Sequence, residues 1–236
     1  MKAEIIGDGL LGAAFRKYEI ESNAIIVCSG VSDSQEKRQS EFKREIELIK
    51  NISLNKNNKV VVYFSSVMAG FGGSEYYAHK SRVERLIVDS FDYYLICRLP
   101  QVVGLAINNT IFPTFVRSIV NRKSILIQRN ATRTLLDVDD VVRIVSFLLE
   151  MNKVCRTVSI CPSHVLSAID LADLIAKELK IDLSYKIVDG GLSQKCDPSD
   201  MLTLLGGDLI FRDDYTSLLV RKYAMKLAVM IKNDPA

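Results

Sequence analysis

The residues best suited to proton transfer lie in two neighbouring stretches of this sequence. One stretch ends in Ser65 and Ser66, and the other contains Tyr76 and, four residues later, Lys80. A phenol has a pKa of ~10, so it exchanges protons poorly at neutral pH unless a nearby ammonium stabilises the phenolate. A serine hydroxyl can hold a substrate oxygen against that phenol. We therefore expect a proton relay that interconverts an alcohol and a carbonyl group.

A buried strand and a helix are expected to position these groups. Residues 60–66 form a continuous run of β-branched and aromatic residues, which is typical of a central parallel strand covered on both faces. Ligands bind outside the carboxyl ends of such strands, where the two serines lie. Residues 75–89 have the apolar periodicity of a helix, so Tyr76 and Lys80 point the same way. Without this context, the same pair would fit a packed aromatic ring and a solvated lysine.

A glycine-rich turn near residue 7 indicates a nucleotide site. Residues 3–6 fit a short strand, and residues 7–12 follow it as G-x-G-x-x-G at the start of a helix. In this context the glycines allow a tight turn and let a pyrophosphate approach the helix N-terminus. A turn with no ligand is the alternative. The residues expected to contact the cofactor here are Gly7, Gly9, Leu10, Leu11 and Gly12.

Composition excludes several classes of function. The chain has 236 residues, of which 48% are hydrophobic, and a net charge of +3. This charge is too small to argue for nucleic-acid binding, and no apolar run is long enough to span a membrane. The first residues lead directly into a strand, which leaves no room for a signal peptide. We expect a globular cytoplasmic protein with neither a nucleic-acid nor a membrane partner.

The cysteines and several charged residues have simple structural interpretations. Five cysteines are scattered through the sequence without metal-binding spacing, so we expect reduced thiols and no metal. Residues 34–50 fit a helix whose mixed charge needs no function, and His79 has no partner that the sequence identifies. Arg98 lies within an apolar strand, so we expect it to be paired.

The strand, the Tyr-x-x-x-Lys pair and the glycine turn together resemble the short-chain dehydrogenases/reductases. Within them, the sequence is similar to the extended branch, the NAD-dependent epimerase/dehydratase family, over about residues 5–205. The family has a catalytic Ser or Thr, a Tyr and a Lys. The resemblance places these roles on Ser66, Tyr76 and Lys80, with Ser65 as the alternative to Ser66.

The resemblance also implies NAD or NADP as the cofactor. Besides the glycine turn, it places cofactor contacts at Cys28, Ser29, Gly30, Ser65, Tyr76 and Lys80. One departure affects this site, because residues 23–31 resemble the family's third strand and follow the first helix almost at once. The second strand-helix unit is therefore expected to be missing, together with the acidic residue that holds the adenosine ribose. The choice between NAD and NADP stays open, and loss of cofactor binding is an alternative.

A second group of motifs resembles the family's substrate site. Residues 133–141 are similar to the family's R-D-F-I-H-V-D-D-V, which places Arg133 on the diphosphate of a nucleotide sugar. A guanidinium suits that task because it is planar and permanently charged. Residues 108–113 resemble the segment that supplies an amide to the nucleotide phosphates, and Asn109 is the candidate.

These observations predict an α/β fold in two parts. The expected architecture is a Rossmann-type parallel sheet with helices on both faces, without its second strand-helix unit, plus a small C-terminal α/β lobe. Residues 1–107 would form the cofactor-binding and catalytic core. Residues 108–236 would form a substrate-binding lobe, interleaved with the last core elements. Family members commonly dimerise through the helix of the catalytic Tyr, so a homodimer is implied by resemblance alone.

The predicted function is an NAD(P)-dependent oxidoreductase of nucleotide sugars, and specifically a 4-keto-sugar reductase. Val67 and Met68 stand where family dehydratases carry an Asp-Glu pair, which argues against dehydration. Two alternatives stay open. One is a nucleotide-sugar 4-epimerase, which uses the same three catalytic residues. The other is a degenerate family member without cofactor that acts as a binding or scaffold protein.

Overall fold

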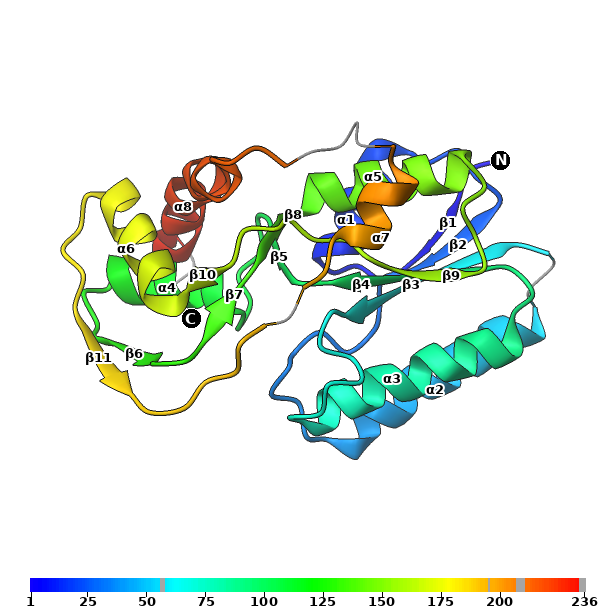
Figure 1. Cartoon of the computed structure of the whole chain (residues 1–236), viewed down its shortest axis with the longest axis horizontal. Helices are drawn as coiled ribbons and strands as arrows, with labels where there is room; N and C mark the ends of the chain where they lie inside the picture. The colour runs from blue at the N-terminus through cyan, green and yellow to red at the C-terminus, as the bar shows by residue number, and fades with distance from the viewer. Residues whose placement is uncertain (56–57, 195, 207–210, 234–236) are drawn as a thin grey trace.

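A parallel five-stranded sheet organises the larger of two lobes (Figure 1). The computed structural model describes residues 1–55, 58–194, 196–206 and 211–233. The strand order is β1-β2-β3-β4-β9, and every neighbouring pair is parallel. The strands are β1 (Glu4–Ile6), β2 (Ala24–Val27), β3 (Val60–Ser66), β4 (Tyr94–Leu99) and β9 (Arg156–Ser159). The predicted Rossmann-type α/β fold is confirmed.

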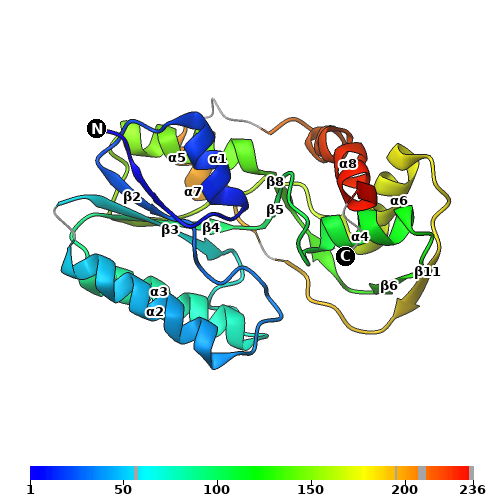
Figure 2. The same cartoon turned by 180° about the vertical axis from the view of Figure 1, so that it is seen from behind.

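Helices cover both faces of this sheet, as Figures 1 and 2 show. One face carries α1 (Leu10–Tyr18), α5 (Val138–Glu150) and α7 (Ser199–Leu204), and the other carries α2 (Gln39–Leu54) and α3 (Glu75–Ser90). Side chains alternate along β3, so Val62 packs into the first helix layer and Val61 and Tyr63 into the second. This two-sided burial explains the continuous apolar run in the sequence.

The sheet ends at β1, which pairs on one side only, with β2, among the described residues. In the usual doubly wound order 3-2-1-4-5-6, two more strands follow on that side. Here, α1 leads through a short connection into β2. We predicted the loss of one strand-helix unit after α1, but neither of these two strands occurs in the described chain, so the loss is larger than predicted. Ala3 N–H instead donates to the carbonyl of Ile20 at 2.8 Å.

The second lobe packs three helices around its own apolar core. These are α4 (Ile111–Val120), α6 (Ala168–Leu179) and α8 (Tyr215–Asn233). Its strands are β6 (Ile125–Gln128), β7 (Thr132–Arg133), β10 (Leu166–Ser167) and β11 (Tyr185–Val188). Between the lobes, β5 (Gln101–Val103) pairs with β8 (Leu135–Asp137). The chain therefore enters the second lobe after β5, returns for α5 and β9, and leaves the core again. No helix in the described part of the chain is long and apolar enough to cross a membrane.

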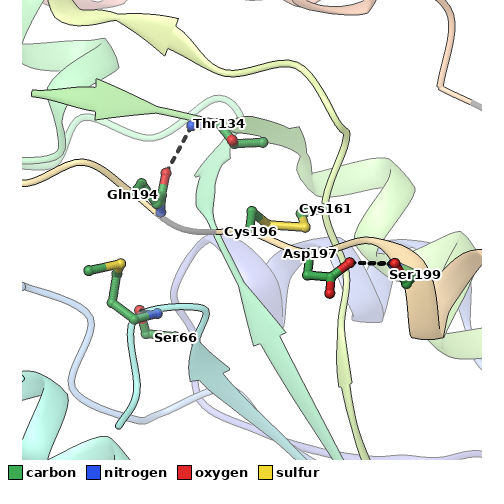
Figure 3. The surroundings of a disulfide bond; sticks show 8 residues. Ser66, Thr134, Cys161, Gln194, Cys196, Asp197 and Ser199 are labelled. Atoms are coloured by element: carbon green, nitrogen blue, oxygen red, sulfur yellow. Dashed lines mark hydrogen bonds between the residues drawn. A yellow bond between two sulfur atoms is a disulfide. The ribbon is translucent and has the colours of Figure 1, made fainter. Parts of the chain in front are cut away.

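A disulfide bond joins two of the segments that run between the lobes. Cys161 follows β9, and Cys196 precedes α7 on the segment that returns from the second lobe (Figure 3). The prediction that all five cysteines are reduced is therefore wrong for this pair. Their Cα atoms lie 6.4 Å apart although 35 positions separate them in sequence, a proximity that only the fold creates. Cys28, Cys97 and Cys155 are free thiols.

Candidate active site

The glycine turn before α1 has the geometry that a bound pyrophosphate needs. Gly7 has a φ of +109°, and a Cβ at Gly12 would lie 2.0 Å from the carbonyl oxygen of Gly7. Gly9, by contrast, faces open space, with nothing within 4 Å of the place of a Cβ. It caps α1 without a side chain, so the first N–H groups of the helix are left for an anion. The turn at Gly7, Gly9, Leu10, Leu11 and Gly12 fits the phosphates of a dinucleotide.

The turn that follows β2 packs directly against the glycine turn. The Cys28 N–H donates to the carbonyl of Ile6 at 2.7 Å, and a Cβ at Gly7 would lie 2.6 Å from the amide nitrogen of Ser29. The structure therefore brings together the two segments expected to hold the cofactor. Burial raises the pKa of the Cys28 thiol to about 12, with the charge of Arg16 opposing the rise, so the thiol is neutral.

Two arginines contact these two turns. Arg16 donates from Nη2 to the carbonyl of Gly7 at 2.8 Å and pairs with the exposed Asp8. Arg44 donates from Nη1 to the carbonyl of Ser29 at 3.1 Å. Arg44 was missed in the sequence because it lies in a helix that we interpreted as a solvated charged surface. The residues present fit the phosphate half of a dinucleotide, with Arg16 and Arg44 on the two turns beside it.

The two serines at the end of β3 are both buried but differ in their contacts. The Ser66 hydroxyl oxygen accepts a hydrogen bond from the Met68 N–H at 3.2 Å, which leaves its own proton to donate. The Ser65 hydroxyl has no partner within the described residues. Among those residues, no hydrogen bond joins Ser66 to Tyr76 or Lys80.

Tyr76 is almost fully buried, with 8% of its surface exposed. Its ring packs against Val31 and Phe42 and meets the Tyr77 ring edge-on, with 5.3 Å between centroids. No hydrogen bond to its hydroxyl occurs in the part of the chain described. Burial raises the pKa of Tyr76 well above its usual range, and the negative charge of Glu45 adds to the rise. Tyr76 is therefore a protonated phenol at neutral pH.

Lys80 lies beside Tyr76 but directs its N–H groups elsewhere. Its Nζ is 5.7 Å from the centroid of the Tyr76 ring. It donates to Glu45 Oε1 at 3.0 Å, to the Tyr63 hydroxyl at 3.0 Å and to the Phe64 carbonyl at 3.3 Å. Burial lowers the pKa of Lys80 by more than Glu45 raises it, so this pKa ends below its usual value. The structure does not show the expected lowering of the Tyr76 pKa by Lys80, because burial raises that pKa and the Glu45 charge adds to the rise.

Glu45 is a second residue that the sequence prediction missed, next to Arg44. It is fully buried on α2, and its carboxylate also accepts from the Val31 N–H at 2.9 Å. His79 Nε2 lies 2.9 Å from Glu45 Oε2. His79 is therefore a buried partner of Glu45 and not a solvent-facing residue. A signal was present in the sequence: Glu45 stands at helical spacing between Phe42 and Ile49, on the buried stripe of α2.

The two predicted substrate residues lie in different surroundings. Arg133 is half-buried and donates from Nη1 to the carbonyls of Thr132 at 2.7 Å and Leu192 at 3.0 Å. Burial lowers the pKa of Arg133, and the nearby Tyr77 opposes this effect. Because Tyr77 lies on α3, Arg133 is close to the helix that carries Tyr76. Asn109 is exposed at the start of α4 and makes no hydrogen bond among the described residues.

A segment at residues 190–194 closes one side of this region, and we call it the strap. The hydroxyls of Thr132 and Ser193 lie 2.9 Å apart, and the Thr134 N–H donates to Gln194 Oε1 at 2.8 Å (Figure 3). A Cβ at Gly73 would lie 3.3 Å from the Leu192 side chain. The strap therefore joins β7 to the loop that precedes Tyr76, and Figure 3 shows Ser66 in the same surroundings.

A family model for the NAD dependent epimerase/dehydratase family matches residues 19–161, more than half of the chain. The chain belongs to the NAD dependent epimerase/dehydratase family. The predicted resemblance is confirmed, and the chain is thereby a member of a family of NAD-dependent enzymes. The match includes β3, Tyr76, Lys80 and Arg133, whereas the glycine turn precedes it. No curated protein matches the chain.

Several solved structures share the fold over nearly the whole chain. RMD from Pseudomonas aeruginosa, solved with NADPH, is 13% identical with a TM-score of 0.78 and covers 98% of this chain and 100% of its own. A dTDP-4-dehydrorhamnose reductase from Clostridium acetobutylicum is 17% identical with a TM-score of 0.78, covering 96% and 99%. A UDP-N-acetylglucosamine 4-epimerase from Bacillus cereus is 17% identical with a TM-score of 0.74 and also covers 96% and 99%. At these identities the likeness establishes the fold alone.

Proposed function

We propose that this chain is an NAD(P)-dependent reductase that converts the keto group of a 4-keto nucleotide sugar to an alcohol. The observation that carries the proposal is the position of Tyr76, a buried phenol whose ring centroid lies 5.7 Å from Lys80 Nζ. A buried proton donor in a family of NAD-dependent enzymes suits the protonation of a carbonyl oxygen during reduction.

Each residue of the site has a role in this proposal. The glycine turn and the first N–H groups of α1 would hold the pyrophosphate of the cofactor, with the Cys28 to Gly30 turn beside it. The cofactor supplies a hydride when bound. Ser66, or Ser65 in its place, would hold the substrate oxygen, and Tyr76 would donate its proton to that oxygen. Arg133 and Asn109 would bind the phosphates of the nucleotide.

The outer edge of the sheet at β1 favours reduction over 4-epimerisation. Both reactions can use Ser66, Tyr76 and Lys80, so these three residues do not separate them. Epimerisation requires the cofactor to stay bound while the sugar rotates, and in the described part of the chain no strand lies on the outer side of β1 to support the adenosine.

One specific observation favours the second candidate, a cofactor-free binding or scaffold protein. All three donors of the Lys80 ammonium are used within the protein, by Glu45, Tyr63 and the Phe64 carbonyl. A lysine that contacts a cofactor ribose would have to exchange one of these hydrogen bonds. Calorimetric titration with NADH and NADPH distinguishes the two candidates, because the scaffold binds neither.

Tyr76→Phe tests the reductase directly. We expect turnover of a 4-keto nucleotide sugar to fall by roughly 10²- to 10⁴-fold, since the variant removes the proton donor. Binding of the nucleotide sugar, measured by calorimetry, should change less than about two-fold, because only the hydroxyl is lost. Tyr93→Phe is the matched control, as Tyr93 is exposed and outside the site. An equal loss of binding and turnover would contradict the assignment and indicate a packing role for Tyr76.

A further inference from the structure

The buried carboxylate of Glu45 is surrounded by four hydrogen-bond partners from three parts of the chain. The Val31 N–H and the Lys80 ammonium lie 2.9 and 3.0 Å from its oxygens. The Tyr63 hydroxyl donates at 2.7 Å, and His79 Nε2 lies at 2.9 Å. A carboxylate has about four acceptor sites, so this one is fully used. Such an arrangement holds the carboxylate ionised and in one orientation.

Glu45 also fixes the place of the Lys80 ammonium. Lys80 is 2% exposed, and a lysine buried in apolar surroundings tends to lose its proton. The carboxylate at 3.0 Å compensates the charge, while the Tyr63 hydroxyl bonds to both members of the pair. The ammonium is therefore held in a position defined by Glu45, close to the Tyr76 ring.

This ion pair lies directly under the turn assigned to the cofactor. A Cβ at Gly30 would meet Glu45 Oε1 at 2.6 Å and Lys80 Nζ at 3.1 Å. A glycine is needed at this position because the pair occupies the space of a side chain. The pair thus contacts both the proposed cofactor turn and the helix of the proposed proton donor.

We propose that Glu45 is a positioning residue of the Tyr76/Lys80 site, which keeps Lys80 protonated and holds its ammonium beside Tyr76. The inference deepens the proposed reductase function and rests on it for its catalytic meaning. A buried ion pair is weak evidence for a purely stabilising role, because well-packed apolar residues can often replace such a pair at little or no cost. The charges and titratable groups that face the pair are His79, Tyr76 and Glu84 on α3, Tyr63 on β3 and Arg44 on α2, while Asp33, after β2, acts on Tyr76.

The test measures the protonation of Lys80 in wild type and in Glu45→Gln. Protein labelled with ¹³C at the lysine ε-carbons is titrated by NMR, and the Lys80 signal is identified by its absence from Lys80→Met. We expect the Lys80 midpoint in Glu45→Gln to lie at least about one pH unit lower, since the compensating charge is gone. Glu45→Asp, which keeps the charge, should restore most of the shift. Glu47→Gln, an exposed position on the same helix, should leave the midpoint unchanged.

Turnover gives a second readout. In Glu45→Gln we expect kcat to fall by about 10- to 100-fold near neutral pH and to recover toward lower pH, as Lys80 regains its proton, while KM changes little. An unchanged Lys80 midpoint would overturn the inference and leave the reductase proposal intact. Absence of turnover in the wild type would overturn the reductase proposal, while the NMR titration would still decide the role of Glu45. If Glu45→Gln does not fold, the NMR titration of wild type tests the inference by itself. A Lys80 that loses its proton below pH 7 in wild type contradicts the proposal.

Discussion

Glu45 changes how the charges of Tyr76 and Lys80 act on each other. The sequence contains the Tyr-x-x-x-Lys pair, but the charge balance of the site depends on a carboxylate 31 positions before Tyr76 in the chain. Burial and the Glu45 charge both raise the pKa of Tyr76. Both effects make Tyr76 a weaker acid, so its place beside Lys80, and not its pKa, suits it to protonate a substrate oxygen.

Glu45 should also make folding stability depend on acidity. Burial raises the pKa of Glu45, but Lys80, His79, Tyr63 and the Val31 N–H lower it by more, so it ends well below its usual range. A carboxyl whose folded pKa is depressed stabilises the fold above its unfolded pKa of ~4.3 and loses that contribution as the pH falls. We expect wild type to lose more stability than Glu45→Gln between neutral pH and about pH 3. Urea unfolding at several pH values measures this, and parallel losses in both proteins would contradict it.

The glycine turn and α1 allow the cofactor site to be tested without disturbing the chemistry. Gly12→Ala should destabilise the fold, because its Cβ would lie 2.0 Å from the Gly7 carbonyl oxygen. Gly9→Ala should leave the melting temperature nearly unchanged, since its Cβ meets nothing within 4 Å and its φ is −69°. The same methyl group would occupy the space of a bound pyrophosphate, so we expect cofactor affinity to fall by at least about ten-fold.

Calorimetry with NADPH and thermal unfolding separate these two effects. Loss of stability in Gly9→Ala, or full cofactor affinity in that variant, would contradict the assignment of the turn.

The elements themselves were largely predictable, because their signals are local. The apolar run of β3 matches the observed bounds, and the periodicity of α3 placed Tyr76 and Lys80 on one side. Arg98 was expected to be paired, and it donates to both carboxylate oxygens of Glu84, at 2.9 and 2.6 Å. The contacts of Glu45 were not predictable, because they join α2, β3 and α3, whose packing no local pattern specifies. The Cys161–Cys196 disulfide was not predictable for the same reason.

The disulfide is expected to stabilise the whole molecule. It closes a loop with a sequence separation of 35, for which chain-entropy arguments give about 4 kcal/mol. We expect Cys161→Ser, or reduction of wild type, to lower the melting temperature clearly. Cys155→Ser is the matched control, because Cys155 is an exposed free thiol. Equal melting temperatures for oxidised and reduced wild type would show that the bond does not form in solution.

The order of elements has a consequence for the chain as it is synthesised. The sheet needs β9 to cover the edge of β4, yet β9 is made only after α4, β6, β7, β8 and α5. Until residues 156–159 leave the ribosome, the nascent core exposes an unpaired, apolar parallel strand, which is a template for aggregation. The larger lobe therefore completes its sheet only after the first part of its neighbour, from α4 to β7, has been translated, and neither lobe can be produced alone by cutting the chain at one point.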